Sequence, residues 1–336
     1  LGIDALAGLL VPLTALLGWT LILAAPRSFA SPEALSRLLV NLGLVTASFL
    51  VRDARAFAVL WVATLVPPYL ELRRTPDTRG VARVYAIYAG TSGVLLVVGL
   101  AWLGLPLTGR ADVWDVRAWS AGAHAGSLIT LLLAVFIRKA TLPFHSWLAM
   151  VFSVAAPGPV LLLVAPMVGA YALVRFTIPL SGELLGPRVL LLGPIALSTA
   201  AYAAGLAFVQ ADLRRIVAWL TISQSAVVLV GLECSEGAGL TGGIVSWLSA
   251  AAGMTGLGLS AWMLEARFGP LDIKKHRGLY RRSRALALVF LLSGLSLVGF
   301  PGTVGFASLD LLSSAVLASF PITGILLFFA TALSGF

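Results

Sequence analysis

The sequence is built from long apolar runs that are separated by short polar connections. Of its 336 residues, 59% are hydrophobic and only 11% are charged, whereas soluble domains carry roughly 25% charged residues. A soluble chain of this length would need a polar surface that these residues cannot supply. The runs are too long and continuous for the alternating strands of an outer-membrane barrel. The sequence therefore predicts an all-α, polytopic membrane helix bundle.

About eleven of the runs are long enough to span a bilayer as a helix of roughly 20 residues. Their expected ranges are 3–25, 35–51, 55–72, 84–107, 122–150, 155–177, 188–209, 213–232, 239–265, 283–318 and 321–336. No connection is long enough for a soluble domain, so residues 1–336 are expected to form a single transmembrane domain. The chain starts at Leu1 and stops within an apolar run, so we expect this domain to be truncated at both ends.

The net charge of +9 comes from basic residues that lie mostly between the runs. This pattern is typical of a multi-pass protein of the cell inner (plasma) membrane, and without a basic stripe interleaved with aromatics it does not indicate nucleic-acid binding. Three histidines and the single Cys234 do not form a zinc pattern, and no phosphate-loop or dinucleotide fingerprint is present. We therefore expect no metal, no cofactor and no catalytic centre in this chain.

Two of the runs, 122–150 and 283–318, are interrupted by helix-breaking residues. Pro143 lies in the first, and Pro301 and Gly302 lie in the second. Such residues free backbone groups, which must find partners in protein or water because lipid offers none. Paired broken helices indicate an ion or substrate path, although a kink that serves only packing gives the same pattern.

Four chargeable residues lie near these breaks, namely Arg138, Lys139, His145 and Asp310. A charge at the centre of a bilayer costs roughly 2.5–3.5 kcal/mol, so such residues are candidates for function. His145 could relay protons, or it could stay neutral and cap freed carbonyl groups. Arg138 and Lys139 could instead extend toward an interface. An isolated Asp310 is expected to be protonated or paired.

Three other acids, Glu71, Asp53 and Asp212, lie close to arginines at the ends of runs. The ends of membrane helices lie near the headgroups, where ion pairs cost less than in the hydrocarbon. For these three carboxylates we therefore expect interfacial salt bridges rather than a part in ion transport.

Several motifs follow one another in an order found in one family. RKATLPFHSWL at 138–148 resembles K-x-x-x-x-P-x-H-x-W-L, and YALVRF at 171–176, DLRRIVAWLTISQ at 212–224 and GFPGT at 299–303 match further motifs. Together they resemble the antiporter-like membrane subunits. That family includes proton-pumping subunits of respiratory complex I, Mrp sodium/proton antiporters, membrane-bound hydrogenases and the membrane subunit of DAB-type inorganic carbon transporters.

The resemblance implies inverted repeats around two broken helices and a row of buried ionisable residues that carries protons or Na⁺ across the membrane midplane. Several positions of that row are apolar here, namely Val62, Met167, Trp247 and Leu309. The ion pathway would then consist of Arg138, Lys139, His145 and Asp310. Arginine does not release its proton, so an unbroken relay depends on the other three.

Three functions fit these features. Two features favour the membrane subunit of a DAB-type inorganic carbon transporter, which couples an ion gradient to a partner protein. They are the motif PFHSWL at 143–148 and the apolar Val62, where the resemblance implies a glutamate. The first alternative is a proton-pumping subunit of a complex I-like NADH:quinone oxidoreductase or membrane hydrogenase. The second is a non-conducting scaffold subunit, which the apolar replacements favour. In each case the partners are other membrane or peripheral subunits and the lipid bilayer.

Overall fold

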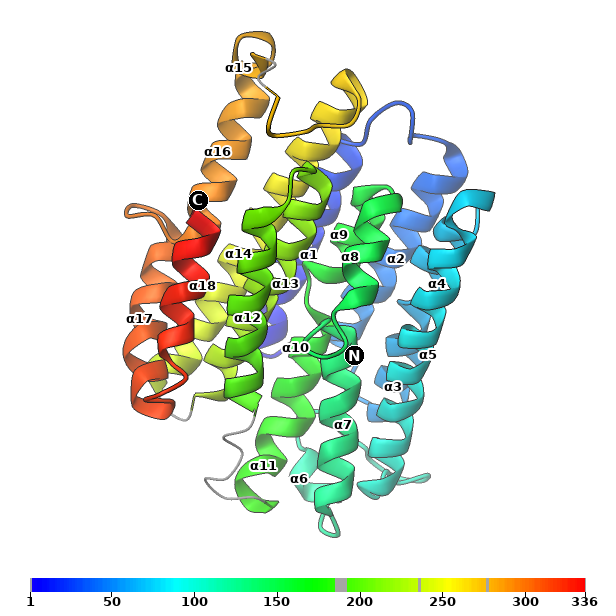
Figure 1. Cartoon of the computed structure of the whole chain (residues 1–336). Helices are drawn as coiled ribbons and strands as arrows, with labels where there is room; N and C mark the ends of the chain where they lie inside the picture. Colours follow the sequence, from blue (N-terminus) through cyan, green and yellow to red (C-terminus); the bar gives the residue numbers. More distant parts are fainter. Residues whose placement is uncertain (1, 185–191, 235–236, 276–277, 336) are drawn as a thin grey trace.

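The structure, a computed structural model, describes residues 2–184, 192–234, 237–275 and 278–335. Apart from two isolated bridges, the regular structure of these residues is helical (Figure 1). The longer helices are α1 (Ala5–Leu23), α2 (Pro32–Leu50), α3 (Ala54–Ala63), α4 (Val66–Leu72), α5 (Arg79–Trp102), α7 (Ala125–Arg138), α8 (Ser146–Val154), α9 (Pro157–Val164), α11 (Ile178–Leu184), α12 (Leu192–Val209), α13 (Leu213–Glu233), α14 (Gly237–Phe268), α16 (Arg284–Val298), α17 (Val304–Ser319) and α18 (Ile325–Gly335). The short ones are η1 (Pro76–Thr78), α6 (Val116–Trp119), α10 (Val168–Ala172), the π-helical η2 (Leu173–Thr177) and α15 (Leu279–Arg282).

Helices lie in every one of the predicted runs, which confirms the polytopic helical bundle. In the described part of the chain, eight stretches of helix are long and apolar enough to cross a membrane. Shorter apolar helices are α7, α16, α17 and α18. The number of spans, the inverted repeats and the single domain stay predictions.

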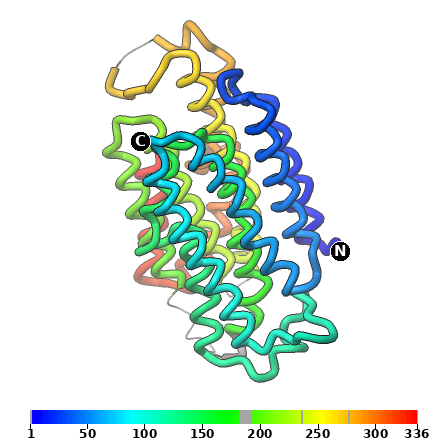
Figure 2. The backbone as a smooth tube through the Cα atoms, turned by 90° about the vertical axis from the view of Figure 1, so that its right-hand side faces the viewer, coloured from blue at the N-terminus to red at the C-terminus, as the bar shows by residue number. Residues whose placement is uncertain are grey.

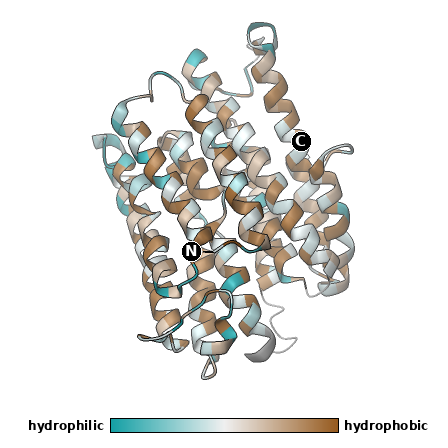
Figure 3. Cartoon of the chain, turned by 180° about the vertical axis from the view of Figure 1, so that it is seen from behind, coloured by the Kyte–Doolittle hydropathy of each residue, from teal (hydrophilic) through white to brown (hydrophobic). Residues whose placement is uncertain are grey.

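Apolar side chains cover the outside of the bundle as well as its inside (Figure 3). Trp19, Ile87, Leu292 and Phe329 are each more than half exposed, although they come from helices far apart in the sequence. An apolar surface of this extent is a liability in water and the normal exterior in lipid. The chain is therefore a multi-pass membrane protein.

Most residues of helix α13 are buried. It packs against α12, α14 and α8, while α1 and the C-terminal helices lie on opposite sides of the bundle (Figure 2). Its residues 221–225 place four buried polar side chains in the interior, those of Thr221, Ser223, Gln224 and Ser225. This helix therefore carries polar groups into the interior of the bundle.

Both predicted breaks are present. The first break, residues 139–145, separates α7 from α8 about halfway along the bundle (Figure 1). The second break, residues 299–303, separates α16 from α17. Gly299 (φ 73°) and Gly302 (φ 92°) adopt the left-handed conformation there, which glycine reaches without the steric penalty of a Cβ atom.

Two further interruptions were not predicted, since we expected 55–72 and 155–177 to be regular spans. Helix α3 ends before Pro67 and Pro68, whose rings and missing N–H groups disrupt the preceding turn. Likewise α9 ends before Pro166, and Met167 takes a left-handed φ of 55° before α10 begins. Both interruptions lie next to the first break and shape its surroundings.

Candidate functional site

Arg138 lies inside the bundle at the C-terminal end of α7, with 8% of its surface exposed. Its guanidinium donates hydrogen bonds to the carbonyl oxygen of Trp61 over 2.8 Å and to Thr64 Oγ1 over 2.6 Å. In a regular helix the Leu65 amide would bond to the Trp61 carbonyl, but here it bonds to that of Val62. The interruption between α3 and α4 therefore leaves a carbonyl group available to Arg138.

Uncharged groups stabilise the Arg138 cation. Its Cζ lies 4.2 Å from the centre of the Trp61 ring, a cation–π contact. It also meets the C-terminal end of α3, where the helix dipole is negative. Among the described residues no ion pair joins Arg138 to a carboxylate. Val62, one of the positions where the resemblance implies an ionisable residue, is apolar and 43% exposed.

Lys139, the C-cap residue of α7, is 5% exposed. Its aliphatic carbons lie so close to Gly169 that a Cβ atom there would be 2.8 Å from Lys139 Cγ. Lys139 lines a small cavity together with Met167, Thr221 and Ser225. In the described part of the chain its amine forms no hydrogen bond or ion pair. The first break thus brings a fixed cation and a less constrained one together.

His145 lies at the far end of the first break, as the N-cap residue of α8, and it is half-buried. Its ring centre is 5.2 Å from that of Tyr202 and 5.6 Å from that of Trp219. Its Nδ1 is buried and has no hydrogen-bond partner in the structure. Pro143 is exposed on the same connection. The histidine is therefore packed among aromatic rings and not bonded to the two basic residues.

The side chain of Asp310 is exposed in the described structure, and its part in an ion pathway stays a prediction. We expected it to be the acid of the second break, but its side chain is exposed on the outer face of α17, and Pro301 and Gly302 are exposed as well. The reason is helical phase. The buried residues of α17 include Gly305, Ser308 and Leu312, and Asp310 lies between the last two on the opposite face.

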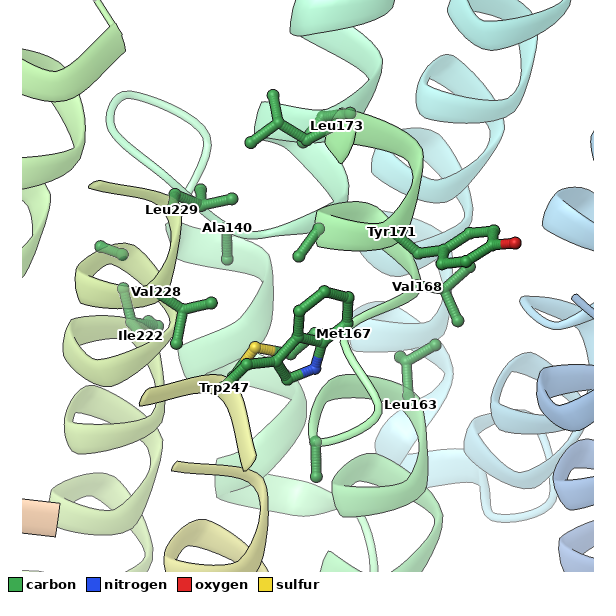
Figure 4. Close-up of a cluster of buried hydrophobic side chains, with 14 of the residues drawn as sticks. Ala140, Leu163, Met167, Val168, Tyr171, Leu173, Ile222, Val228, Leu229 and Trp247 are labelled. Atoms are coloured by element: carbon green, nitrogen blue, oxygen red, sulfur yellow. The ribbon is translucent and has the colours of Figure 1, made fainter. Parts of the chain in front are cut away.

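Apolar side chains fill two of the positions where the resemblance expects charge. Met167 and Trp247 are almost fully buried and lie side by side, with Ile222 and Val228 nearby (Figure 4). Trp247 Nε1 donates a hydrogen bond to the carbonyl oxygen of Pro166 over 3.3 Å. We call Met167 and Trp247 the apolar plug. It lies next to the cavity of Lys139, which Met167 also lines.

The expected interfacial salt bridges are present. Arg37 Nη2 lies 2.8 Å from Glu71 Oε2, and Arg215 pairs with Asp212 at 3.8 Å. Asp53, which caps the N-terminus of α3, pairs with Arg55. Hydrogen bonding from the Arg55 side chain lowers the pKa of the Asp53 carboxyl group to about 2. These acids stabilise helix ends, and their ion pairs within the described ranges are all with arginines outside the two breaks.

The acids of the described residues do not gather into a site. No group of three or more histidine, cysteine, aspartate or glutamate side chains is placed to hold a metal ion within the described ranges. Glu233, which we did not single out from the sequence, has both carboxyl oxygens buried without a hydrogen-bond partner. Glu233 ends a long apolar run, where an acid normally lies at the interface, so its burial could not be predicted from the residues alone.

The sequence of the chain is similar to a family model and to known proteins. The transmembrane family model described as NADH:quinone oxidoreductase/Mrp antiporter matches residues 53–334. NAD(P)H-quinone oxidoreductase chain 4 1 of Synechococcus elongatus is 28% identical over 318 residues, and NADH-quinone oxidoreductase subunit M of Escherichia coli K12 is 26% identical over 328. These alignments cover 92% and 91% of this chain. The chain spans 59% and 64% of those relatives' own lengths.

A solved structure shares the fold. One chain in the structure of respiratory complex I from Thermus thermophilus with bound NADH matches 99% of this chain, with a TM-score of 0.87 and 26% identity. The match covers 72% of that chain. The fold of this bundle therefore also occurs in a chain of respiratory complex I.

Proposed function

Because the chain belongs to the NADH:quinone oxidoreductase/Mrp antiporter family of transmembrane proteins, we propose that it is an antiporter-like subunit that moves protons across the inner membrane within a larger complex. The observation that carries this proposal is the buried pair Arg138 and Lys139 at a helix break halfway through the bundle. Buried basic residues are costly in a membrane, and neither of them has a carboxylate that would explain it as a structural ion pair.

The two basic residues have different roles in this proposal. Arg138 is held by the Trp61 carbonyl and the Thr64 hydroxyl, and arginine keeps its proton under all ordinary conditions. Lys139 faces a cavity with two hydroxyl-bearing side chains, and no bond to another described residue fixes its amine. Lysine can both load and release a proton. Lys139 is therefore the relay group, and Arg138 is a fixed charge beside it.

The motif PFHSWL favoured an inorganic carbon transporter. The similar proteins are quinone oxidoreductase subunits and a chain of respiratory complex I, and they favour a subunit of a redox-linked assembly instead. A carboxylate exposed to lipid would cost several kcal/mol, so we expect another polypeptide segment to cover Asp310, and in this proposal that segment belongs to a partner subunit. Mass spectrometry of chains that co-purify in mild detergent would separate the two assemblies. Quinone-reactive or iron–sulfur subunits support the first, and a soluble zinc protein supports the second.

A second candidate function is the non-conducting scaffold. The apolar plug favours it, because Met167 and Trp247 put apolar atoms where a continuous row of ionisable side chains would run. A scaffold needs no Lys139 amine and tolerates its removal. The relay needs a group that gives up its proton and does not tolerate arginine in its place.

The test is proton uptake by liposomes that contain the purified complex, driven by an imposed membrane potential and followed with a pH-sensitive dye. Lys139→Met and Lys139→Arg are both expected to lower uptake tenfold or more, since neither side chain relays a proton. Lys274→Met, at an exposed lysine in a connection, is the matched control and leaves uptake unchanged. Wild-type uptake in both Lys139 variants would overturn the relay in favour of the scaffold.

A further inference from the structure

An apolar groove lies where α3 and α4 pack against α5 (Figure 1). It has a volume of about 460 Å³. The side chains that line it are apolar apart from the hydroxyl groups of Tyr69 and Tyr85. The Tyr85 hydroxyl is already used, because it donates a hydrogen bond to the carbonyl oxygen of Leu65 over 3.1 Å. The groove therefore suits an apolar ligand and offers little to a polar one.

Small residues of α5 make this groove, and it opens to the outside of the bundle. Its lining includes Ala86, Gly90 and Gly93, and a Cβ atom at Gly90 would have nothing within 4 Å. Val66 and Val94, which also line the groove, are exposed. The surroundings of a membrane helix at this depth are the hydrocarbon chains of lipids. The groove is therefore accessible to a lipid chain.

Arginines follow the lining residues at one end of the groove, on both of its walls. On α4, Arg73 comes one helical turn after Tyr69, and its Cζ lies 5.6 Å from the centre of that ring. On α5, Arg83 and Arg79 precede Ala86 at the spacing that keeps residues on one side of a helix. The three arginines therefore lie at the same end of the groove.

Nearby acids do not neutralise these three arginines. All three are exposed, and no ion pair involves them within the described residues. Residues 72–86 contain four arginines and a single acid, Asp77. Glu71, the acid of α4, already pairs with Arg37 at 2.8 Å. This excess of positive charge favours an anionic group, and guanidinium groups match the geometry of phosphate oxygens.

The length of the groove fits one leaflet of a bilayer. From Ala86 to Val98, α5 rises about 18 Å. The hydrocarbon core of a bilayer is about 30 Å thick, so the chains of one leaflet reach about 15 Å. The end of the bundle that carries Arg73 also carries Arg281 and Arg282 of α15 (Figure 1). A basic end is typical of the cytoplasmic side, where the leaflet contains anionic lipids.

We propose that the groove between α4 and α5 binds an anionic phospholipid, with one acyl chain in the groove and the phosphate group at Arg73 and Arg83. An apolar helix of a partner subunit would also fit the walls, but it would leave the arginines without a counter-charge. Leu65 and Tyr85 line both the groove and the small cavity that Arg138 lines. The bound chain therefore covers the side of the bundle next to Arg138. This proposal goes beyond the proposed function and does not depend on it.

The test uses a phosphatidylglycerol that carries a photoactivatable diazirine on one acyl chain. It is added in trace amount to phosphatidylcholine vesicles that contain the purified complex, and labelled peptides are identified by mass spectrometry. We expect the labels to concentrate on residues 62–72 and 86–98. Phosphatidylcholine with the same diazirine should label these segments about tenfold less, because it lacks the net negative charge.

The role of the arginines is tested by removing their charge. Arg73→Gln combined with Arg83→Gln should lower labelling by the phosphatidylglycerol about tenfold. The matched control combines Arg267→Gln with Arg281→Gln, which removes the same charge from exposed arginines of α14 and α15 and should leave the labelling unchanged.

The role of the groove is tested by filling it. Gly90→Leu places a side chain in the open space of the groove and should lower labelling of both segments by either lipid. Gly43→Leu is the matched control, because Gly43 of α2 is exposed and nothing lies within 4 Å of a Cβ atom there. The arginine variants leave the groove open, so they test the proposal even if Gly90→Leu does not assemble.

Three results would overturn the lipid site. Equal labelling by the two lipids would mean that the groove accepts any acyl chain. Unchanged labelling in Gly90→Leu would place the lipid elsewhere. No labelling of either segment in the assembled complex would mean that a partner subunit covers the groove. Lys139→Met should be labelled like the unmodified complex, so the proton-uptake assay tests the proposed function separately.

Discussion

At the first break two basic side chains lie inside the bundle, whereas at the second break the buried polar side chains are uncharged and the nearest acid, Asp310, lies outside. Both breaks interrupt a helix within the bundle. At the first, one carbonyl group freed by a neighbouring interrupted helix and one hydroxyl group bind Arg138 directly. At the second, side chains of four helices surround a space of water size. The same backbone feature thus supports a charged site in one place and a neutral one in the other.

A break therefore provides hydrogen-bond partners, and the phase of the helix decides which side chain can reach them. Arg138 ends a helix whose preceding residues, from Ala134 on, are all buried, so it enters the bundle. Asp310 lies only a few residues after its break, but the inward face of α17 is taken by Ser308 and Leu312. Proximity to a break in the sequence is therefore weak evidence for a place on a pathway.

The largest expected effect comes from adding one methyl group to a helix that packs against each break, at Gly305 of α17 or at Gly169 of α10. In Gly305→Ala the new Cβ would lie 1.8 Å from a backbone oxygen, and the backbone has no easy way to move. In Gly169→Ala it would meet the flexible stem of Lys139 at 2.8 Å. We expect Gly305→Ala to destabilise the chain by about 3 kcal/mol and Gly169→Ala by about 1 kcal/mol or less.

Thermal unfolding of the two variants in the same detergent checks this difference. Gly90→Ala is the control, because nothing lies within 4 Å of a Cβ atom at that helical position and its stability should not fall. Equal losses in Gly305→Ala and Gly169→Ala would mean that the second break is as adaptable as the first. In the proton assay, Gly169→Ala should still lower uptake, because it displaces the Lys139 side chain.

The next effect concerns the acid outside the bundle. Asp310→Asn should leave the melting temperature of the purified chain unchanged, because its exposed carboxylate contributes no ion pair in the described structure. When the same variant is purified from membranes, the amount of partner chains that co-purify should fall several-fold, since a partner is expected to cover this carboxylate. Quantitative mass spectrometry of the co-purified complex measures the change. Asp310→Glu is the control, and normal recovery with Asp310→Asn would remove Asp310 from the subunit interface.

The helix ranges and both breaks could be predicted because their signals are local. Hydropathy over about 20 residues marks a span, and proline or glycine within it marks an interruption. The interruptions at Pro67 and Pro166 carried the same kind of signal. They were missed because each falls within a run that otherwise has the length and hydropathy of a regular span.

The chemistry of the second break could not be predicted from the sequence. Serine, threonine and glutamine occur throughout membrane helices, and only the packing of α13, α14, α16 and α17 brings Gln224, Ser249 and Ser308 together. The outward direction of Asp310 and the burial of Glu233 depend on packing in the same way. Arg138 and Lys139 were found because a charge within an apolar run is conspicuous by itself.

The smallest expected effect concerns an ion pair at a helix end, away from both breaks, and its contribution to the stability of the folded chain. Asp53 has its pKa lowered to about 2 by the Arg55 side chain, so its ion pair stabilises the folded chain above the unfolded-state pKa. That stabilisation is lost as the pH falls from about 4 through 2. Because the carboxylate is 37% exposed, solvent screening limits this stabilisation to about 1 kcal/mol or less.

Asp53→Asn keeps a helix-capping side chain and removes the charge. Its melting temperature should lie slightly below that of the unmodified chain at pH 6 and equal it near pH 2, whereas a constant difference would assign the effect to capping.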